Sequence, residues 1–328
     1  MEHRDKKTYV IALGGNSILR ANQKETIEEQ YTNLTQTGYQ LLELLSDEHR
    51  IVITHGNGPQ VGNLLLAMET AKNLVPPISL DLCGAATQGF MGFMIQLTFA
   101  NCLREAGKKH NISTVISQMI VDKNDPAFQQ PSKPVGAFYS FHEAKKLQIE
   151  RGWKMAEDSS RGYRRVFPSP HPKSIQQSRI IKRMLDAGEI VIALGGGGIP
   201  VTRETDGSLR AVEAVIDKDL ASSCLAKEID ADVLLFLTAV DKVYLNFGLA
   251  SQSALDHLNI SQALDYLEQC QFGKGSMEPK ISASIDFLKG PSTSNQTGLA
   301  VRNREVFITL PEKAMSALQG HSGTRITV

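Results

Sequence analysis

The segment Tyr9-Val-Ile-Ala-Leu-Gly-Gly-Asn16 joins five apolar residues directly to two glycines. A short, continuous apolar run that ends in turn residues predicts a strand buried on both faces. The next segment, residues 27–45, places apolar side chains at intervals of three and four, which is the spacing of one helix face. A buried strand that passes through a tight glycine turn into a helix is the first half of a βαβ unit.

The same order of elements recurs along the chain. Ile51-Val-Ile-Thr54 predicts a second strand, and His55-Gly-Asn-Gly-Pro59 is its turn into another helix. Further strands are expected at residues 115–121, 190–194, 233–237 and 306–309, with helical spacing between most of them. Strands that alternate with helices predict an α/β fold whose mainly parallel sheet is covered by helices on both faces.

Residues 124–172 interrupt this alternation. They are rich in proline, glycine and charge, as in Pro131-Ser-Lys-Pro134 and Pro168-Ser-Pro-His-Pro172, a composition that does not make core strands or helices of a parallel sheet. The aromatic residues among them argue against disorder. We therefore expect a small protruding lid subdomain that takes part in function, in preference to a long surface insertion without a role. The whole chain, residues 1–328, is expected to form a single domain around it.

The composition restricts the possible partners. The 328 residues include 35 basic and 35 acidic side chains, so the formal net charge is zero. Nucleic-acid binders and membrane-surface proteins usually carry a basic excess, so neither nucleic acid nor a membrane is expected as a partner. The start of the chain shows no leader peptide, and no stretch approaches the roughly 18 apolar residues of a membrane span. The four cysteines are far apart, which disfavours zinc or disulfides and indicates a cytoplasmic protein.

Glycines follow three of the predicted strands, at Gly14-Gly15-Asn16, Gly56-Asn57-Gly58 and Gly195–Gly198. In open α/β sheets, ligands bind beyond the carboxyl ends of the strands, where glycine lets backbone N–H groups approach an anion closely. One such loop has a simpler explanation, because tight turns need glycine for steric reasons alone. Three such loops in one chain favour phosphate or carboxylate binding.

The standard nucleotide-binding fingerprints are absent. None of the four G-x-G pairs is completed to G-x-G-x-x-G, so the dinucleotide fingerprint fails. Gly273-Lys274 is followed by Gly275 in place of Ser or Thr, so the chain has no Walker A loop. G-x-S-x-G and H-E-x-x-H are also absent, which removes the support for a serine hydrolase and leaves no metal-ligating residues to expect.

Three lysines stand beside glycine-rich or proline-rich turns. Lys218 lies at the predicted start of a helix in Ile216-Asp-Lys-Asp219, and Lys280 follows Ser276-Met-Glu-Pro279, which marks another helix start. A lysine at a helix N-terminus opposes the macrodipole, so it suits a site that receives an anion. The alternative for each is a solvated side chain. Lys133 lies between two prolines of the lid, which are stiff enough to aim its amine inward.

Other candidates carry less weight. Asp217 and Asp219 flank Lys218, where they either orient the lysine or cap a helix. His55 is interpreted as a turn residue beside its glycines. The Met- and Phe-rich residues 90–99 are expected to form core or a subunit interface rather than a cofactor pocket.

In this order the motifs resemble those of the carbamate kinases, a branch of the amino acid kinase family. The segments that carry the resemblance are Val10–Asn16, Thr54–Gly62, Asp125–Phe128, Pro131–Gly136, Glu157–Arg165, Gly195–Val201, Val212–Ala221, Leu237–Gly248 and Gly275–Lys280. It runs from about residue 8 to residue 326 and covers nearly the whole chain. Thr54–Gln60 and Pro131–Pro134 are the segments specific to the carbamate branch.

The resemblance implies a three-layer αβα sandwich with an open, mainly parallel eight-stranded sheet and a small protruding lid, usually as a homodimer. It implies that the N-terminal part holds carbamate and that residues 190–328 hold the nucleotide. The catalytic residues it implies are Lys133, Lys218, Lys280 and Asp219. The binding residues it implies are Gly14, Gly15, Asn16, Gly196 and Gly197 for phosphate, Gly56, Asn57 and Gly58 for carbamate, and Asp241, Tyr244 and Met277 for the nucleotide.

The implied reaction is reversible phosphoryl transfer between ATP and carbamate, with Mg²⁺ accompanying the nucleotide. Carbamate is already an anion, so it needs no general base, and catalysis reduces to positioning and charge neutralisation. A lid is expected, because carbamate and its phosphorylated form both decompose in water. The expected direction is ATP formation from ADP and carbamoyl phosphate, in the breakdown of arginine or a related carbamoyl compound.

Two alternatives to this function stay open. One is a kinase of the same fold that acts on acetylglutamate, aspartate or a nucleoside monophosphate. The other is a metabolite sensor that binds nucleotide without turning it over. The glycine and lid motifs argue against the first, and the three lysines argue against the second.

Three positions depart from the family pattern. Ser17 stands where Ala is usual, Ser160 stands where Gly is expected before Arg161, and Thr309-Leu-Pro311 replaces a turn of the Thr-Ser-Leu type. None of them removes a charged ligand. The last is expected to alter the wall on the nucleotide side.

Overall fold

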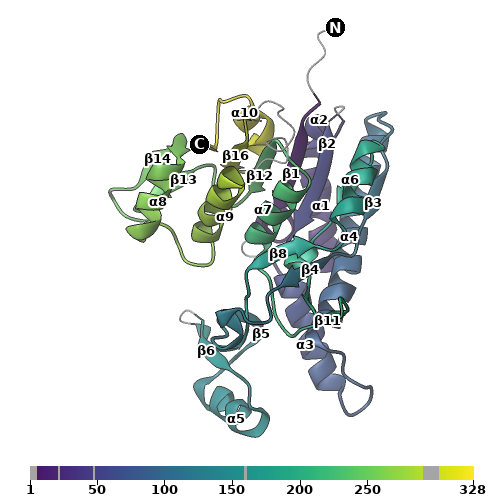
Figure 1. Ribbon diagram of the computed structural model, residues 1–328, viewed down its shortest axis with the longest axis vertical. Helices are drawn as coiled ribbons and strands as arrows, with labels where there is room; N and C mark the ends of the chain where they lie inside the picture. Colours follow the sequence, from purple (N-terminus) through teal and green to yellow (C-terminus); the bar gives the residue numbers. More distant parts are fainter. Residues whose placement is uncertain (1–5, 21–22, 47–48, 159–160, 291–302) are drawn as a thin grey trace.

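An eight-stranded sheet forms the centre of the molecule (Figure 1). The computed structural model describes residues 6–20, 23–46, 49–158, 161–290 and 303–328. Across the sheet the strands are β15 (His257–Asn259), β17 (Thr324–Thr327), β16 (Glu305–Thr309), β12 (Val233–Leu237), β1 (Thr8–Leu13), β2 (Arg50–His55), β9 (Ile190–Ile192) and β3 (Ile112–Thr114). Every neighbouring pair is parallel except β16 and β17. The mainly parallel α/β sheet is therefore confirmed.

Strand β1 shows why this sheet is covered on both faces. All six of its residues are buried. Val10 and Ala12 belong to the hydrophobic core on one face, and Tyr9, Ile11 and Leu13 belong to the core on the other. Successive side chains of a strand point to opposite faces, so a continuous apolar run requires an apolar layer on each side.

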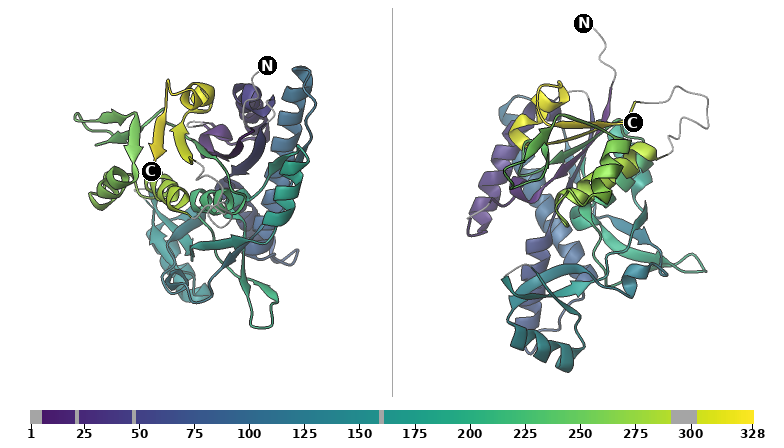
Figure 2. Two further views of the ribbon diagram at one scale, coloured as in Figure 1. Left: turned by 45° about the horizontal axis from the view of Figure 1, so that its top comes forward. Right: turned by 90° about the vertical axis from the view of Figure 1, so that its left-hand side faces the viewer.

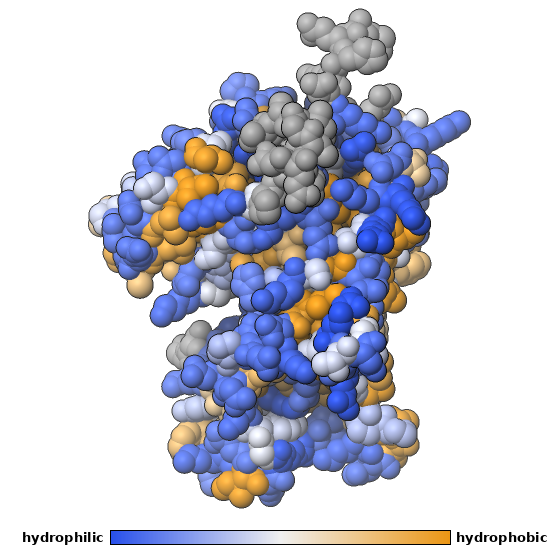
Figure 3. All heavy atoms as spheres, viewed as in Figure 1, coloured by the Kyte–Doolittle hydropathy of each residue, from blue (hydrophilic) through white to orange (hydrophobic). Residues whose placement is uncertain are grey.

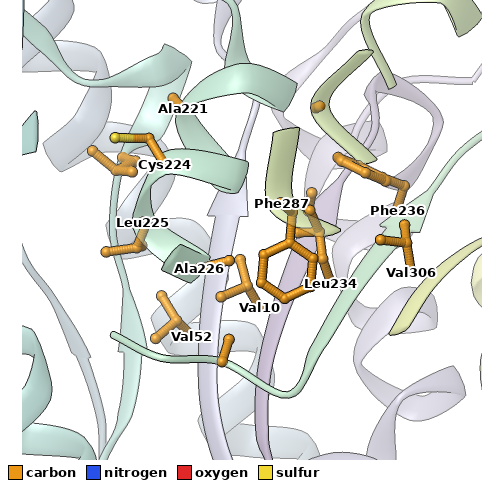
Figure 4. Close-up of a cluster of buried hydrophobic side chains, with 14 of the residues drawn as sticks. Val10, Val52, Ala221, Cys224, Leu225, Ala226, Leu234, Phe236, Phe287 and Val306 are labelled. Carbon is orange, nitrogen blue, oxygen red and sulfur yellow. The ribbon is translucent and has the colours of Figure 1, made fainter. Parts of the chain in front are cut away.

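Helices supply these two outer layers. One face is covered by α6 (Ser178–Asp186), α7 (Lys218–Glu228), α8 (Ile260–Glu268) and α9 (Met277–Lys289), the other by α1 (Ile27–Gln40), α2 (Leu42–Ser46), α4 (Leu80–Glu105) and α10 (Ala314–Leu318). Figure 4 shows Leu225 of α7 and Phe287 of α9 packed over Val10 and Leu234 of the sheet. On the opposite face Phe99 of α4 is fully buried. Burying a side chain of this size contributes about 1.5–3 kcal/mol, so the two cores hold the three layers together.

Only residues 118–121 of the strand predicted over residues 115–121 form a strand, and they belong to a sheet separate from the central one. The central sheet ends with β3 at Thr114, and β4 (Gln118–Val121) joins a separate sheet in the order β11 (Leu209–Ala211), β10 (Ile199–Arg203), β4, β8 (Pro172–Ile175). Ser117 lies between β3 and β4, where its Oγ donates to the carbonyl of Val115 at 2.7 Å and accepts from the N–H of Leu194 at 3.1 Å. These bonds hold a turn that the apolar run itself does not signal.

Residues 133–167 form a small unit that projects from the body (Figures 1 and 2). Its antiparallel sheet has the order β5 (Lys133–Tyr139), β7 (Tyr163–Phe167), β6 (Met155–Glu157), and α5 (Phe141–Arg151) follows β5. The guanidinium of Arg165 stacks 4.7 Å from the ring centroid of Trp153 and 4.3 Å from that of Phe167. The unit therefore has an aromatic core of its own, and it packs against α3 (Gly58–Ala71).

The helices begin at the residues that the capping signals mark. Ser276 is the N-cap of α9 and Lys218 is the first residue of α7, as the sequence predicts. The side chain of Asp217 caps α7 by accepting from the backbone N–H groups of Asp219 and Leu220. Among the described residues, no helix has both the length and the apolar character that a membrane crossing requires.

Candidate functional site

The carboxyl ends of β1, β2, β9 and β12 meet at one edge of the sheet, because these strands are parallel. That edge faces the projecting unit of residues 133–167 (Figure 1). Figure 3 shows the surface hollowed between this unit and the part of the body that carries α8 and α9. The glycine loops of the sequence follow β1, β2 and β9, so all three lie at this edge.

Gly14 and Gly15 follow β1 and differ in what surrounds them. The N–H of Gly14 donates to the carbonyl of Leu237 at 2.8 Å, and a Cβ on Gly14 would lie 2.3 Å from that oxygen. Gly15 opens the 3-10 turn η1 (Gly15–Ser17), and a Cβ there would meet no atom within 4 Å. Packing thus explains Gly14, whereas Gly15 leaves backbone open to a ligand.

Gly56, Asn57 and Gly58 connect β2 to α3. A Cβ on either glycine would meet nothing within 4 Å. Asn57 is buried, and its Nδ2 donates to Thr87 Oγ1 at 2.8 Å. A pocket is lined by Asn57 and Gly58 of this turn, by three of the glycines after β9 and by residues that include Val135 of the projecting unit. The turn therefore offers open backbone at the floor of a pocket.

The four glycines after β9 have a structural reason to be glycine. Gly196 and Gly197 adopt positive φ angles of 64° and 92°. A Cβ on Gly196 would lie 2.0 Å from Asn57 Oδ1, and one on Gly197 would lie 2.5 Å from the carbonyl oxygen of Ile216. The close packing against Asn57 and Ile216 leaves no room for a side chain at either position, and Gly196 also lines the pocket.

Three lysines and two aspartates come together beside these loops. Lys280 Nζ donates to Asp219 Oδ2 at 2.9 Å, and Lys218 Nζ lies 3.1 Å from Asp219 Oδ1. Lys218 Nζ also donates to the carbonyl of Leu13 at 3.0 Å, which places the ammonium next to Gly14. Lys133 Nζ, from the start of β5, donates to Asp217 Oδ2 at 2.7 Å. Lysines from three distant segments are thus joined by two neighbouring aspartates, and one of them reaches the end of β1.

Burial and neighbouring charges have opposite effects on the pKa values of Lys218 and Asp219. Removal from water lowers the pKa of Lys218, although the carboxylate of Asp219 partly offsets this. Burial on its own would raise the pKa of Asp219, but the charges of Lys218 and Lys280 outweigh it and hold that pKa below its ordinary value. With three ammonium groups against two carboxylates, the cluster keeps one positive charge in excess for an incoming anion.

Asp241 and Tyr244, the predicted nucleotide-side residues, contact each other. Tyr244 OH donates to Asp241 Oδ1 at 2.6 Å, and Lys313 Nζ donates to Asp241 Oδ2 at 3.1 Å. The hydrogen bond from Tyr244, followed by the lysine, lowers the pKa of Asp241. Met277 is the first residue of α9, where it packs against the hydrophobic core. Lys313 did not figure among the predicted site residues, because no sequence motif connects it to Asp241.

His55 is the last residue of β2 rather than a turn residue. It is buried, and its Nδ1 lies 2.9 Å from the carbonyl oxygen of Gly56. Burial, with the nearby charge of Lys218, lowers the pKa of His55 to about 4. The ring is therefore neutral at ordinary pH, so Nδ1 donates its proton to Gly56 and fixes that carbonyl. The apolar run before it was the available signal that β2 continues to His55.

The residues of the site fit a metal ion carried by a nucleotide better than one held by protein. No group of three or more His, Cys, Asp or Glu side chains in the described ranges could hold a metal ion. Mg²⁺ in phosphoryl-transfer sites is usually bound by one or two carboxylates together with substrate phosphates. Asp219 is the buried carboxylate of this site, and its Oδ1 already faces Lys218 Nζ at 3.1 Å.

The three departures from the family pattern lie in different surroundings. Ser17 is buried in η1, and its Oγ has no hydrogen-bond partner among the described residues. Pro311 opens the 3-10 turn η6 (Pro311–Lys313), which brings Lys313 to Asp241. Ser160 lies outside the described residues. Of the three, the Pro311 turn is the one with a direct connection to a predicted site residue.

The chain is similar to known proteins over nearly its full length. The model of the amino acid kinase family matches residues 7–294. The carbamate kinase of Pyrococcus horikoshii is 44% identical over 320 residues, which cover 97% of this chain and 98% of that protein. The carbamate kinase-like protein YahI of Escherichia coli is 44% identical over 324 residues, which cover 98% and 99%. Among solved structures, the carbamate kinase from Giardia lamblia bound to AMP-PNP is 37% identical, with a TM-score of 0.88 over 98% of this chain and 99% of that one.

Proposed function

The chain belongs to the amino acid kinase family, and from this membership we propose that it is a carbamate kinase, an enzyme that transfers a phosphoryl group between ATP and carbamate. One observation carries the proposal. Lys218 reaches the end of β1, beside backbone that is open at Gly15, and Asp219 and Asp217 hold Lys280 and Lys133 in the same cluster, which has three lysines against two aspartates. Charge neutralisation and positioning are what transfer between two anions requires.

Each part of the site has a role in this proposal. Lys218 and Lys280 neutralise the transferring phosphoryl group, and Asp219 holds their two ammonium groups side by side. Lys133 reaches the carbamoyl end of the substrate from the lid. Carbamate lies at the turn whose glycines face open space. The phosphate-binding residues are Gly14, Gly15, Asn16, Gly196 and Gly197, and the carbamate-binding residues are Gly56, Asn57 and Gly58.

The nucleotide is assigned to the side of the site formed by residues 190–328. Asp241, Tyr244 and Met277 are its proposed contacts, supported by the hydrogen bond that pairs Tyr244 with Asp241. Mg²⁺ would accompany the phosphates and supply positive charge there, and Asp219 is the residue of the lysine cluster that would help to hold it. Lys133 and the projecting unit would exclude water from the acyl phosphate.

The proposal also covers the direction of the reaction and the location of the protein in the cell. Carbamoyl phosphate is a strong phosphoryl donor, so we expect the reaction to make ATP from ADP in the breakdown of arginine or a related carbamoyl compound, in the cytoplasm. The dispersed cysteines agree with that setting.

The face of α4 that points away from the core supports a homodimer. This helix buries apolar residues such as Met91 and Phe99 in the core, and its opposite side is apolar as well. The exposed apolar residues on that side, at intervals that a helix brings to one face, are Leu82, Phe90, Phe93 and Leu97. An exposed apolar face of this kind usually marks an interface, and we assign it to a second copy of the chain.

Coupled ATP production tests the activity. Purified protein receives ADP, Mg²⁺ and carbamoyl phosphate, and ATP is followed against a blank without enzyme. Saturable ATP formation is expected, whereas no product above the blank would contradict the proposal. Acetyl phosphate, N-acetylglutamate with ATP, aspartate with ATP and UMP with ATP, run in parallel, separate the other kinases of this fold. Nucleotide binding without turnover of any of them would identify a sensor.

Lysine variants check that the measured activity belongs to this site. Lys218→Ala and Lys280→Ala each remove a donor aimed at the transferring group, so turnover is expected to fall roughly a hundredfold or more. Circular dichroism is the control for folding, because Asp219 loses an ion-pair partner in each variant. ATP formation at the wild-type rate in either variant would remove that lysine from the mechanism.

A further inference from the structure

Asp217 holds two groups from distant parts of the chain at once. Its Oδ1 accepts from the backbone N–H of Asp219 at 2.9 Å and from that of Leu220 at 3.3 Å, which caps α7. Its Oδ2 accepts from Lys133 Nζ at 2.7 Å. The carboxylate therefore connects the first residue of the lid strand β5 to the helix that begins with Lys218.

Capping alone does not account for a charged residue here. Asn and Ser cap a helix as well as Asp does, and a cap uses one side-chain oxygen. The second oxygen and the charge are used by Lys133. The lysine side chain of this ion pair is 33% exposed and that of Asp217 is 14% exposed, so water screens the lysine, and the clearest consequence of the pair is the position it gives to the ammonium.

We propose that Asp217 is a positioning residue, which holds the Lys133 ammonium over the site before substrate arrives and then yields it to the anionic carbamoyl phosphate. A lysine amine is a point charge on a flexible four-carbon stem. Without an anchor, the side chain would lose conformational entropy when substrate bound, and this cost would weaken substrate binding. Asp217 orders the side chain in the free enzyme. The inference rests on the proposed function, since it assigns Lys133 to the carbamoyl end of the same site.

The structure offers a matched control for this ion pair. Arg165 Nη2 lies 3.1 Å from Glu213 Oε1, which is a second ion pair between the projecting unit and the segment that leads into α7. Glu213 is 58% exposed, caps no helix and does not contact Lys133 in the described structure. Glu213→Gln therefore removes a charge between the same two parts of the molecule and leaves Lys133 on Asp217.

The test compares Asp217→Asn, which keeps the cap and the shape of the side chain, with Glu213→Gln and the wild type. In coupled ATP production, Asp217→Asn is expected to raise the KM for carbamoyl phosphate roughly tenfold, the worth of one long side chain ordered in advance. Its KM for ADP is expected to stay within about twofold of wild type. Glu213→Gln is expected to match wild type for both substrates. Asp217→Ala, which also loses the cap, reports separately on the helix through its melting temperature.

A binding measurement gives a second readout. Trp153 is the one tryptophan of the chain and lies in the projecting unit, so its fluorescence during titration with fresh carbamoyl phosphate reports on this unit without turnover. The midpoint of the titration is expected to shift with the KM in Asp217→Asn. Added to Lys133→Ala, Asp217→Asn is expected to change nothing further.

The outcomes separate the two proposals. A wild type that forms no ATP contradicts the proposed function. A wild type that forms ATP, with Asp217→Asn leaving both the KM for carbamoyl phosphate and the fluorescence midpoint unchanged, overturns the role of Asp217. Equal rises in both KM values together with a lowered melting temperature also overturn it, because they show a residue that acts through the helix alone.

Discussion

Glycines near the site fall into two kinds that the fold treats differently. Gly197 has a φ of 92°, and a side chain on it would run into the carbonyl of Ile216. Gly15 has neither constraint, since a Cβ there would meet no atom within 4 Å. A glycine that the fold does not require, in a loop beside a buried lysine cluster, is best explained by a ligand that approaches its backbone.

Alanine should therefore reduce stability at Gly197 and reduce activity at Gly15. Gly197→Ala is expected to lower the free energy of unfolding by about 2–4 kcal/mol, because it combines a strained φ with a backbone clash. Gly15→Ala is expected to leave the melting temperature unchanged and to reduce kcat/KM roughly ten- to a hundredfold by displacing the phosphate. Thermal unfolding and coupled ATP production measure the two effects. A fully active Gly15→Ala would show that no ligand approaches this backbone.

His55 makes stability depend on pH. The unfolded chain binds a proton at this residue as the pH falls through about 6.5, whereas burial keeps the folded residue neutral until about pH 4. Between these values unfolding takes up a proton, so the free energy of unfolding decreases as the pH decreases. The contribution of His55 is complete above pH 6.5 and is progressively lost toward pH 4.

This loss should be visible in urea unfolding at pH 7 and pH 5. His55 alone is expected to remove about 2 kcal/mol of stability between these two values. His55→Gln keeps a polar side chain that does not titrate, so its stability should fall by about that much less than the wild type over the same interval. Equal falls in both proteins would show that His55 does not stay neutral when folded.

At the scale of elements, the sequence predicts those strands and helix starts whose signal lies in neighbouring residues. The buried strands β1, β2, β12 and β16 appear as apolar runs, and the starts of α7 and α9 appear as caps, because each signal lies within the element itself. The loss of residues 115–117 from the predicted strand was not predictable, since it depends on Ser117 accepting a hydrogen bond from Leu194, in another part of the chain. The separate sheet of residues 133–167 was also missed, because its short strands lack the continuous apolar runs of the central sheet.

The same distinction applies to the site. Gly-rich loops and lysines at helix starts are local signals, so the sequence alone singles out Lys218 and Lys280, which the structure brings together on Asp219. The contacts of Lys133 with Asp217 and of Lys313 with Asp241 join residues 84 and 72 positions apart. Such pairs arise from the topology of the chain, and one sequence does not contain them.

Helix α3 and strand β5 approach each other closely through two glycines. A Cβ on Gly62 would lie 3.1 Å from the Cα of Gly136 and 3.2 Å from its backbone nitrogen. Both atoms belong to the main chain, so they move aside only if the strand moves. The position of the projecting unit, and with it Lys133, therefore depends on the absence of a side chain at Gly62.

Gly62→Ala tests whether the position of β5 depends on this glycine. Helix propensity alone would make the substitution favourable, so a harmful effect would come from the contact with β5. Alanine favours the helix by about 1 kcal/mol, yet it should displace β5 and raise the KM for carbamoyl phosphate several-fold, as a shift of the lid lysine would. The neighbouring Asn63 is exposed, so Asn63→Ala is the control for helix propensity alone. If Gly62→Ala has the KM of the wild type, the glycine contact does not set the position of the lid.

At the scale of the whole molecule, net charge and function are separate properties. The chain balances 35 basic against 35 acidic residues, so no broad positive field draws phosphates in. In the proposed site the positive charge is held by three lysines, two of which, Lys218 and Lys280, are largely buried beside Asp219. Burial makes such charges effective at short range, so the proposed binding of phosphates does not require a net positive charge on the whole protein.

The outer face of α4 should hold two copies of the molecule together. We expect light scattering after size exclusion to give about 72 kDa, twice the 35.9 kDa of the chain. Phe93 is 57% exposed in the single chain, and Phe93→Glu would place a charge in the apolar interface and shift the mass toward that of one chain. Ile149→Glu, on the exposed side of α5, is the matched control and should stay dimeric. A wild type that remains at 35.9 kDa at micromolar concentration would show that this face does not join two copies.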